Sequence, residues 1–510
     1  MQALAAVATV LAFAPHGNRI EFQLDHGSAE LEWVTASTFR FRRVLSGRLP
    51  DVKSKETEAV AIQADDVPGA VRLRSKYLDV TIQKHGLLVR VRKLDGSTLL
   101  ADLSEPRSEA AGVTWERQSP AGAQLYGLGP RVDAVFDLHG KSVRAEVPFL
   151  LSTSGYGEYH AGAGGYHFDF TSDDRYRIQG SEIDYFFYYG PSPKEIFDEH
   201  RYAHGTAEPW QVSADRFGSW STLRAALLRL VQGAMSAALS PEFDLTPYAN
   251  APPDLQQRAR QLGSIVPVVV AGPLGASEFR QQLKTFFSTY TAELGDHGYP
   301  IWHPLPFQMA EDREGARHAD EFLLGDEMLI APIYEPGDQR TVYLPRGIWT
   351  NLETNQATQG PRTITVKTQT LPVFARNGTI IPLDSTGGSL ALHYFPKLGA
   401  EFFLLESDIA EYSQVHAAPA ADLMRLEIES KKDRDYQWVV HHVDKPAAVE
   451  FEEVHYRQIT APSQMANRTW FYDPLPGFCR CGYTPSQART ASSTFGSSLS
   501  PAILYLHRSK

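Results

Sequence analysis

The stretch ADRFGSW, residues 214–220, sets a single carboxylate, Asp215, before an arginine, two aromatic residues, a glycine and a serine. A carboxyl group can act as a general acid and base, because it gives a proton to a leaving group and takes one from water. The alternative is structural, since a helix beginning at about Ser219 would be stabilised by a nearby negative charge by roughly 0.3–1 kcal/mol. The residue types alone leave both interpretations of Asp215 open.

The segment after Asp215 is predicted to be helical. Residues 220–239, WSTLRAALLRLVQGAMSAAL, repeat apolar side chains at helical spacing. The apolar face of this helix is expected to consist of Leu223, Leu227, Leu230, Val231 and Ala234. Residues 254–262, DLQQRARQL, predict a second helix with Asp254 as its N-cap.

A third helix and a strand complete this segment. SEFRQQLKTFFSTYTAEL, residues 277–294, predicts one helix that begins behind Ser277. SIVPVVVAG, at 264–272, is a run of β-branched residues typical of a strand buried on both faces of a parallel sheet. Because parallel strands need crossover connections, usually helices, residues 215–325 are predicted to be α/β.

Strands dominate the chain on both sides of this segment. Upstream, short runs of alternating polarity such as RIEFQL, TFRFRRV, LDVTIQ and IDYFFYYG predict a large antiparallel β-sandwich. Downstream, strands return from about residue 326, and a Gly-Gly pair at 387 and 388 precedes a last β-rich region. The tail from about residue 484 is rich in Ser and Thr and is predicted to be loosely ordered.

The composition argues against several classes of partner. The 510 residues carry a formal net charge of -11, and no run of Lys or Arg interleaves with aromatic residues, so nucleic acid is not an expected partner. No apolar run reaches the roughly 18 residues of a membrane-spanning helix, so no membrane is expected either. With 2 cysteines, and no cluster of His, Asp or Glu at metal-ligand spacing, neither a metal ion nor another cofactor is expected.

The first residues, MQALAAVATVLAFAPHG, resemble the apolar core of a signal peptide followed by a small-residue cleavage site. They lack the positive charge that usually precedes such a core. Export to the periplasm or the extracellular space is therefore one expectation, and a cytoplasmic protein whose chain opens on a buried strand is the other.

Several longer stretches occur together in an order that is specific to one family. They are LYGLGPR at 125–131, VPFLLSTSGYGEY at 147–159, YFFYYGPSPKEIFDEH at 185–200, GYPIWHPLPFQM at 298–309, DEFLLGDEMLIAPIYE at 320–335 and LPVFARNGTIIPL at 371–383. Together they resemble glycoside hydrolase family 31, a family of retaining α-glucosidases and α-xylosidases.

The resemblance implies a multidomain β plus α/β fold: a galactose-mutarotase-like N-terminal β-sandwich, a (β/α)8 barrel and C-terminal β-sandwich domains. A complete barrel needs about 250 residues, yet about 115 separate Pro209 from Gly325, so the barrel is expected to be truncated. Missing strands leave unpaired edges, so we expect an open α/β layer on the N-terminal sandwich, or a homodimer that covers the edges. The expected units are a possible signal peptide at 1–17, the N-terminal β-sandwich at 18–208, the truncated barrel at 209–325, a proximal C-terminal β-sandwich at 326–386, a distal β domain at 387–483 and the tail at 484–510.

The resemblance assigns roles to a few polar residues. Asp215 occupies the acid/base position, although Ala214 replaces the glycine of the family's motif. Asp244 stands where the family has an aspartate followed by a Gly-rich turn, and Arg258 matches an arginine of a downstream run, so both are candidate substrate-binding residues. Arg258 has a structural alternative as a charge on its helix.

Other features of the family are missing. A retaining glycosidase holds two carboxyl groups about 5–5.5 Å apart, one as the nucleophile and one as the acid and base. The strand that bears the nucleophile lies in the absent part, so no nucleophile is identified, and Asp244 is the one substitute considered. Val270 and Gly272 replace an arginine and a histidine that face the substrate in the family, and His303, which replaces another arginine, is interpreted as a buried or turn residue.

We therefore expect a family 31 homologue, descended from an α-glucosidase or α-xylosidase, whose hydrolysis of α-linked sugars is lost or severely impaired. One alternative is a non-catalytic protein that binds carbohydrate, an α-glycoside, or another partner through its sandwich domains. A further alternative is that the shortened chain has no selected function.

Overall fold

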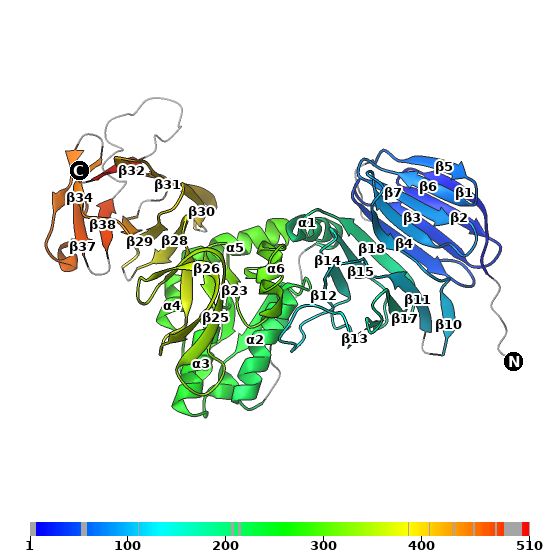
Figure 1. The fold of residues 1–510 in the computed structure, drawn as a ribbon, viewed down its shortest axis with the longest axis horizontal. Coiled ribbons are helices and arrows are strands. Elements are labelled where there is room, and N and C mark those ends of the chain that lie inside the picture. Colours follow the sequence, from blue (N-terminus) through cyan, green and yellow to red (C-terminus); the bar gives the residue numbers. More distant parts are fainter. Residues whose placement is uncertain are drawn as a thin grey trace.

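The structure is a computed structural model that describes residues 7–52, 59–110, 112–205, 209–212, 216–385, 387–406, 408–430, 432, 434–451, 454–474, 477–483 and 502–508. Sheets form the two ends of the molecule, and helices lie between them (Figure 1). Asp215 lies outside the described residues. So does most of the predicted loose tail, but its residues Ala502–Arg508 form strand β39.

The N-terminal end is built from antiparallel sheets, as the alternating patterns predict. In the described residues the largest has the strand order β1-β2-β3-β4-β18-β15-β14-β12. Its strands are Val10–His16, Arg19–Leu24, Ser28–Trp33, Thr38–Val44, Ile183–Tyr189, Tyr156–His160, Phe149–Ser152 and Leu125–Gly127. Strand β1 thus includes the end of the predicted signal peptide, and export stays a prediction.

Two further antiparallel sheets share a core with the first. One runs β5-β6-β7-β8-β9, with strands Gln63–Val67, Ala70–Arg74, Leu78–Gln83, Val89–Lys93 and Thr98–Ala101. The other runs β10-β11-β17-β16-β13, with strands Arg107–Glu109, Gly112–Gln118, Arg175–Gly180, His167–Asp169 and Ser142–Arg144. Leu31, Val80 and Ile178 come from the three sheets and lie in one buried cluster, so the arrangement is sandwich-like.

The middle of the molecule contains helices and one short parallel sheet. The helices are α1 (Pro193–His204), α2 (Trp220–Ala234), α3 (Pro253–Gly263), α4 (Glu278–Gln282), α5 (Lys284–His297) and α6 (Leu305–Gln308), with 3₁₀ turns η1 (Thr246–Tyr248), η2 (Gly272–Leu274) and η3 (Gly315–Arg317). The parallel strands are β19 (Pro209–Gln211), β20 (Ser240–Asp244) and β21 (Val268–Val270). The sheets found in the described residues include no closed eight-stranded barrel.

The predicted face of helix α2 is confirmed, but two other details of this segment were wrong. The predicted stripe from Leu223 to Ala234 is fully buried. Pro252, not Asp254, is the N-cap of α3, because the fixed φ of Pro253 suits the first helical position. The strand expected to be buried on both faces is only the short β21, and the side chains of Val268 and Val270 are half exposed, because β21 is an edge strand.

The third predicted helix is two helices. Ser277 caps α4 as expected, since its Oγ accepts the N–H of Arg280. The chain then leaves helical geometry at Leu283, which has φ -86° and ψ 8°. Helix α5 begins anew because the carboxylate of Asp384 accepts both the N–H and the hydroxyl of Thr285, each at 2.7 Å. Contact with a distant segment therefore overrides the continuous helical pattern.

The C-terminal end contains three more sheets. The first runs β22-β23-β24-β27-β25-β26, with strands Trp302–Pro304, Phe322–Leu324, Met328–Ile330, Val373–Arg376, Gln339–Asn351 and Ala357–Lys367. The second runs β28-β29-β33-β38-β37-β36, with strands Thr379–Asp384, Leu390–Phe395, Tyr436–His441, Phe478–Tyr483, Thr469–Asp473 and Arg457–Gln458. The third runs β30-β31-β32-β39-β34-β35, with the remaining strands Ala400–Glu406, Glu411–Pro419, Leu423–Glu429, Pro446–Phe451 and Val454–His455.

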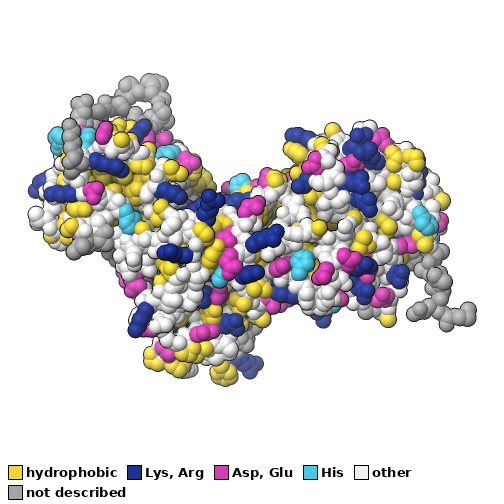
Figure 2. Space-filling view, viewed as in Figure 1, with side chains coloured by type: hydrophobic (Ala, Val, Ile, Leu, Met, Phe, Trp, Pro, Cys, Tyr) yellow, Lys and Arg dark blue, Asp and Glu magenta, His cyan; other side chains and the backbone are white. Residues whose placement is uncertain are grey.

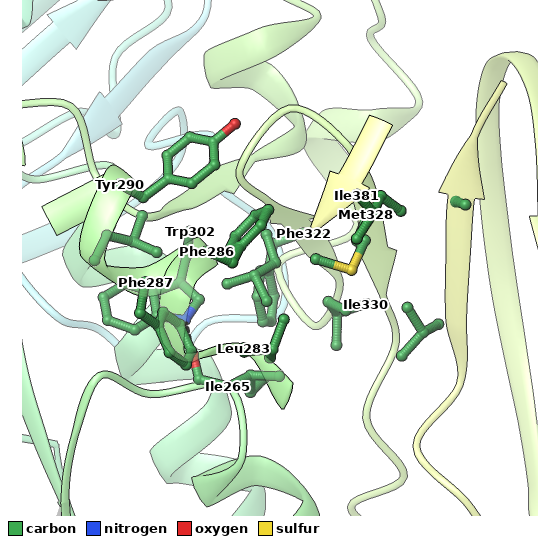
Figure 3. Packing of buried hydrophobic residues seen from close by; sticks show 14 of the residues in the cluster. Ile265, Leu283, Phe286, Phe287, Tyr290, Trp302, Phe322, Met328, Ile330 and Ile381 are labelled. Atoms are coloured by element: carbon green, nitrogen blue, oxygen red, sulfur yellow. Dashed lines mark hydrogen bonds between the residues drawn. The ribbon is translucent and has the colours of Figure 1, made fainter. Parts of the chain in front are cut away.

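Helix α5 joins these sheets through a buried cluster (Figure 3). The labelled members are Ile265, Leu283, Phe286, Phe287, Tyr290, Trp302, Phe322, Met328, Ile330 and Ile381. In that view the hydroxyl of Tyr290 points away from the other labelled side chains. On the outer surface, Lys and Arg side chains alternate with Asp and Glu over the face drawn in Figure 2.

Candidate functional site

The predicted catalytic segment leaves the parallel sheet at the C-terminal end of its strands. Strand β19 pairs with β20, where Gln211 lies opposite Glu242, and β20 pairs with β21, where Asp244 lies opposite Val270. Asp215 follows Gln211 by four residues and lies outside the described residues. Because carboxyl ends of parallel strands meet at one edge, the chain leaves β19 and β20 at the same edge of the sheet.

The segments that follow β19 and β20 are tied together just beyond the sheet. The N–H of Gly218 donates to the carbonyl of Pro247 at 2.8 Å. A Cβ on Gly218 would lie 2.4 Å from the ring of Tyr248, so the close approach requires glycine. Helix α2 then begins at Ser219, whose Oγ accepts the N–H of Thr222 at 3.2 Å. The capping residues of the helix therefore fix the chain that follows Asp215.

Asp244 stabilises the turn after its own strand. Its Oδ1 accepts the N–H of Thr246 at 2.8 Å. The N–H of Leu245, between these two residues, donates to the carbonyl of Val270 at 2.9 Å. The side chain of Asp244 is half-buried, and its Oδ2 forms no hydrogen bond or ion pair with a described residue. An aspartate that bonds the backbone two residues later is a common turn device, so this geometry does not require a substrate.

Arg258 lies on α3 and its guanidinium is buried against the first C-terminal sheet. Its terminal nitrogens donate to Oε1 of Gln261 at 3.0 Å and to backbone carbonyls at 3.1–3.2 Å. Those carbonyls belong to Gly337, Thr368, Gln369 and Thr370. The guanidinium thus connects α3 to two loops. This geometry fits a structural role for Arg258, the alternative to substrate binding.

Val270 and Gly272, where the family that this sequence resembles has an arginine and a histidine, offer no polar side chain. Val270 lies on the exposed edge strand β21. Gly272 has φ +52° and starts η2, where a Cβ would come within 3.0 Å of Thr246 Oγ1. His303 is fully buried on β22, with its Nδ1 2.9 Å from Oδ1 of Asp326 and its ring against Phe307.

A cavity of 510 Å³ lies beside strand β19, and we call it the Trp210 cavity. Its lining includes Tyr159, His200, Trp210, Arg229 and Glu146. Arg229 donates through Nε to the carbonyl of Val212 and pairs with Glu146 at 3.1 Å, while its guanidinium lies over the ring of Trp210. The cavity therefore combines aromatic faces with a charged pair.

The histidines of this cavity were missed in the sequence. His200 and His204 are four residues apart on α1, a spacing that places both rings on one helix face. The hydroxyl of Tyr188 lies 3.0 Å from Nδ1 of His200 and 2.7 Å from Nε2 of His204. Burial lowers the pKa of His200 well below its usual value, with His204 adding to the effect.

Nothing in the described part of the chain points to a metal centre or a membrane span. Among those residues no group of three or more His, Cys, Asp and Glu could hold a metal ion. In the same part of the chain, no helix is long and apolar enough to cross a membrane.

Comparison with known proteins gives local sequence matches. Residues 298–381 match the model of the glycosyl hydrolase family 31 C-terminal domain. The chain is 32% identical over 107 residues to an alpha-glucosidase of Saccharolobus solfataricus, which covers 21% of this chain and 15% of that protein. It is 27% identical over 214 residues to alpha-glucosidase 2 of Bacillus thermoamyloliquefaciens, covering 36% of this chain and 27% of that protein. The chain thus matches less than a third of either relative's length.

Solved structures give matches over nearly the whole fold. A GH31 dextranase from Flavobacterium johnsoniae, complexed with glucose, has a TM-score of 0.80 at 14% identity, covering 99% of this chain and 100% of that chain. A GH31 alpha-xylosidase from Xanthomonas citri has a TM-score of 0.65 at 11% identity, covering 86% of this chain and 97% of that chain. These likenesses show a shared, mostly β fold with sandwich-like sheets.

Proposed function

Because the chain belongs to glycoside hydrolase family 31, we propose that it is an α-glucosidase-like homologue in which hydrolysis of O-glycosyl bonds is lost or severely impaired. The observation that supports this most is the three-stranded parallel sheet β19-β20-β21 of the described residues. A family barrel has eight such strands, and we interpret this sheet as the remnant of a truncated one.

The chemistry of the proposal follows from the missing partner of Asp215. A retaining reaction needs a nucleophilic carboxylate about 5–5.5 Å from the acid. Asp244 is the neighbouring candidate, but its Oδ1 is engaged by the backbone of Thr246. With Val270 and Gly272 in place of polar side chains, a sugar bound here would also lose groups that orient it, and orientation carries much of the rate.

Turnover of 4-nitrophenyl α-glucoside and α-xyloside tests the proposal. We expect no release of nitrophenol above the uncatalysed rate, and no difference between the wild-type chain and Asp215→Asn. Asp244→Asn serves as the matched carboxylate variant. Turnover that Asp215→Asn abolishes would overturn the proposal, because it would require a working acid and a nucleophile.

Carbohydrate binding without hydrolysis is the second candidate, and the Trp210 cavity favours it. Aromatic faces such as Trp210 and Tyr159 stack on sugar rings, while a charged pair such as Arg229 and Glu146 can bond hydroxyl groups. Structures of the Flavobacterium dextranase contain glucose and isomaltotriose. Calorimetry with isomaltotriose is expected to give binding that Trp210→Ala weakens about 10-fold, as for lost stacking of about 1.4 kcal/mol. Equal affinity of the wild-type protein and the Trp210→Ala variant would exclude this cavity as the sugar-binding site.

A further inference from the structure

A second cavity, of 300 Å³, lies between helix α5 and strand β30, far along the chain from Asp215, and we call it the α5–β30 pocket. Tyr290 and Glu293 line it from α5, and Glu327 lines it from the turn between β23 and β24. Phe402, Phe403 and Tyr412 line it from the third C-terminal sheet. The pocket thus has an acidic side and an aromatic side.

Glu327 is the most deeply buried acid of the pocket, with 7% of its surface exposed. Its Oε2 accepts the hydroxyl of Tyr290 at 2.7 Å and the N–H of Asp326 at 3.0 Å. Its Oε1 makes no hydrogen bond or ion pair to any described residue, although the side chain lines the pocket. Oε1 is not among the buried polar atoms without a partner, so it is reached from the cavity and can accept a hydrogen bond from a ligand there.

Glu293 lies one turn beyond Tyr290 on the same helix. Its carboxylate is partly buried and forms no hydrogen bond or ion pair with the described residues. Burial raises the pKa of Glu293, an effect that His303 and Lys194 oppose. Burial and the charge of Asp326 raise the pKa of Glu327 to about 8. Both carboxylates therefore lack a counter-charge close enough to offset their burial.

The rest of the lining adds negative charge and little positive charge. Asp296 and Glu401 are exposed acids on the pocket. Within the described lining His297 is the one basic side chain, and its Nδ1 lies 2.9 Å from Asp198 outside the pocket. Lys194 is also engaged elsewhere, 3.3 Å from Oδ2 of Asp326.

The aromatic side is packed at its base and open at its rim. Phe402 is buried and meets the ring of Tyr290 edge-on at 6.2 Å between centroids. Phe403 and Tyr412 are 48% and 53% exposed, so their faces are available to a ligand. Aromatic faces attract cations by about 0.5–2 kcal/mol and also cover aliphatic carbon, which makes them suitable beside carboxylates for an organic cation.

We infer that the α5–β30 pocket binds an alkylammonium cation, whose N–H donors bond Glu293 and the open oxygen of Glu327 while its methylene groups lie against Phe403 and Tyr412. An ammonium group has three donors and no acceptor, which suits two carboxylates that lack partners. A metal ion suits the site less, because the described residues include no group of three or more metal-binding side chains. The inference does not depend on the proposed function, since the pocket involves neither Asp215 nor the parallel sheet.

Calorimetry on the full chain at about pH 9, where Glu327 is ionised and an alkylammonium group is still charged, tests the inference. The ligands are 1,5-diaminopentane, N-acetyl-lysine methylamide and the neutral pentane-1,5-diol. We expect binding of an amine and none of the diol. Equal affinity for both amines would indicate a lysine side chain of a protein, and preference for the diamine a free polyamine. Binding of neither amine, equal binding of the diol, or binding of calcium chloride alone would overturn the inference.

Variants locate the binding. Glu293→Gln removes one charge without breaking any hydrogen bond of the described fold, and it should weaken the diamine about 10-fold or more, as for loss of a charged hydrogen bond. Phe403→Ala should weaken it roughly 3-fold to 10-fold. The matched control is Glu335→Gln, which makes the same change at an exposed acid that does not line the pocket, and it should leave affinity unchanged. An equal loss of diamine affinity in Glu335→Gln and Glu293→Gln would mean that net charge alone governs binding, and it would overturn the assignment of the α5–β30 pocket as the binding site.

Discussion

Two regions that contain polar groups with functional potential differ in how completely the fold satisfies the hydrogen bonds of those groups. At the ends of β19 and β20, Asp244 bonds its own turn and Arg258 bonds backbone carbonyls. In the α5–β30 pocket, Glu293 and one oxygen of Glu327 lack partners among the described residues. A group whose bonds are completed within the fold stabilises that fold, whereas a buried group left open is available to a ligand. Position in a family and capacity to bind are therefore separate properties.

The largest expected effect is on Arg258. Arg258→Met keeps most of the side-chain volume but removes every donor, so the buried carbonyl of Thr368 and the part-buried carbonyl of Gly337 lose their partner. Because several acceptors lose a hydrogen bond from a charged group, we expect the free energy of unfolding, measured in urea, to fall by about 3–5 kcal/mol. The matched control is Arg260→Met on an exposed position of the same helix, which should change stability by less than about 0.5 kcal/mol. Unchanged stability together with lost sugar binding would instead make Arg258 a substrate-binding residue.

The second prediction concerns the pH dependence of stability at Glu327. Its pKa is about 4.5 as an unperturbed group and is raised to about 8 in the folded chain. Between these values the folded state binds more protons than the unfolded state, so stability falls as pH rises from 4.5 to 8. Glu327→Gln remains neutral and keeps an acceptor for Tyr290. It should be more stable than the wild-type chain at pH 8 by on the order of 3 kcal/mol, with the difference closing toward pH 4.5.

Denaturant midpoints measured from pH 4.5 to 8 check this prediction. Asp326 titrates in a separate window, because the hydrogen bond from His303 keeps its pKa below the usual range despite burial. Its contribution is lost only as pH falls below about 3.8, so it does not mask the effect of Glu327. If the stability of Glu327→Gln and of the wild-type chain changed equally with pH, Glu327 would ionise without a cost from burial. The α5–β30 pocket would then resemble the ends of β19 and β20, where the polar groups are satisfied.

Sequence patterns predicted the helices and strands better than they predicted the buried polar groups that lack hydrogen-bond partners. The alternating run at Arg19–Leu24 and the apolar stripe of α2 both report burial that depends on local periodicity. The break at Leu283 was missed because its cause, Asp384, lies 99 residues from Thr285 along the chain. Glu327 opens a run that the sequence predicts to be a strand, and nothing in that run marks its carboxylate as buried. Its burial arises only when Tyr290 and Phe402 are brought onto it by α5 and β30.

The candidate site was predicted in part. The patterns predicted the helix that begins after Ser219, whereas Asp215 lies outside the described residues. They did not predict the Trp210 cavity or the bonds of Arg258, because both depend on contacts between α1, α2, α3 and loops distant in the chain. Tertiary contacts of this kind have no period that a sequence can show.

A third, smaller effect is expected where Gly218 contacts Tyr248. Gly218→Ala places a methyl group 2.4 Å from that buried ring, so Gly218 and Tyr248 must move apart. The cost should be about 1–3 kcal/mol in urea unfolding. Gly295→Ala is the control, because its methyl group meets nothing within 4 Å on α5, and it should stabilise by about 0.5–1 kcal/mol. Equal effects of the two substitutions would show that the predicted site is loosely packed.

The smallest expected effect concerns the open edge of the parallel sheet. Val268 and Val270 leave apolar surface on β21, whose far side has no strand neighbour in the described residues. Exposed edges of this kind pair with another chain, so we expect the protein to form a homodimer that sedimentation can detect. Val268→Lys with Val270→Lys should raise its dissociation constant about 10-fold, since lysine on an edge opposes pairing. Val132→Lys with Val135→Lys adds the same charge at exposed valines outside any described strand and should leave association unchanged. Equal weakening of the dimer by both double substitutions would mean that added charge, not the β21 edge, governs association. The edge of the parallel sheet would then need no partner strand.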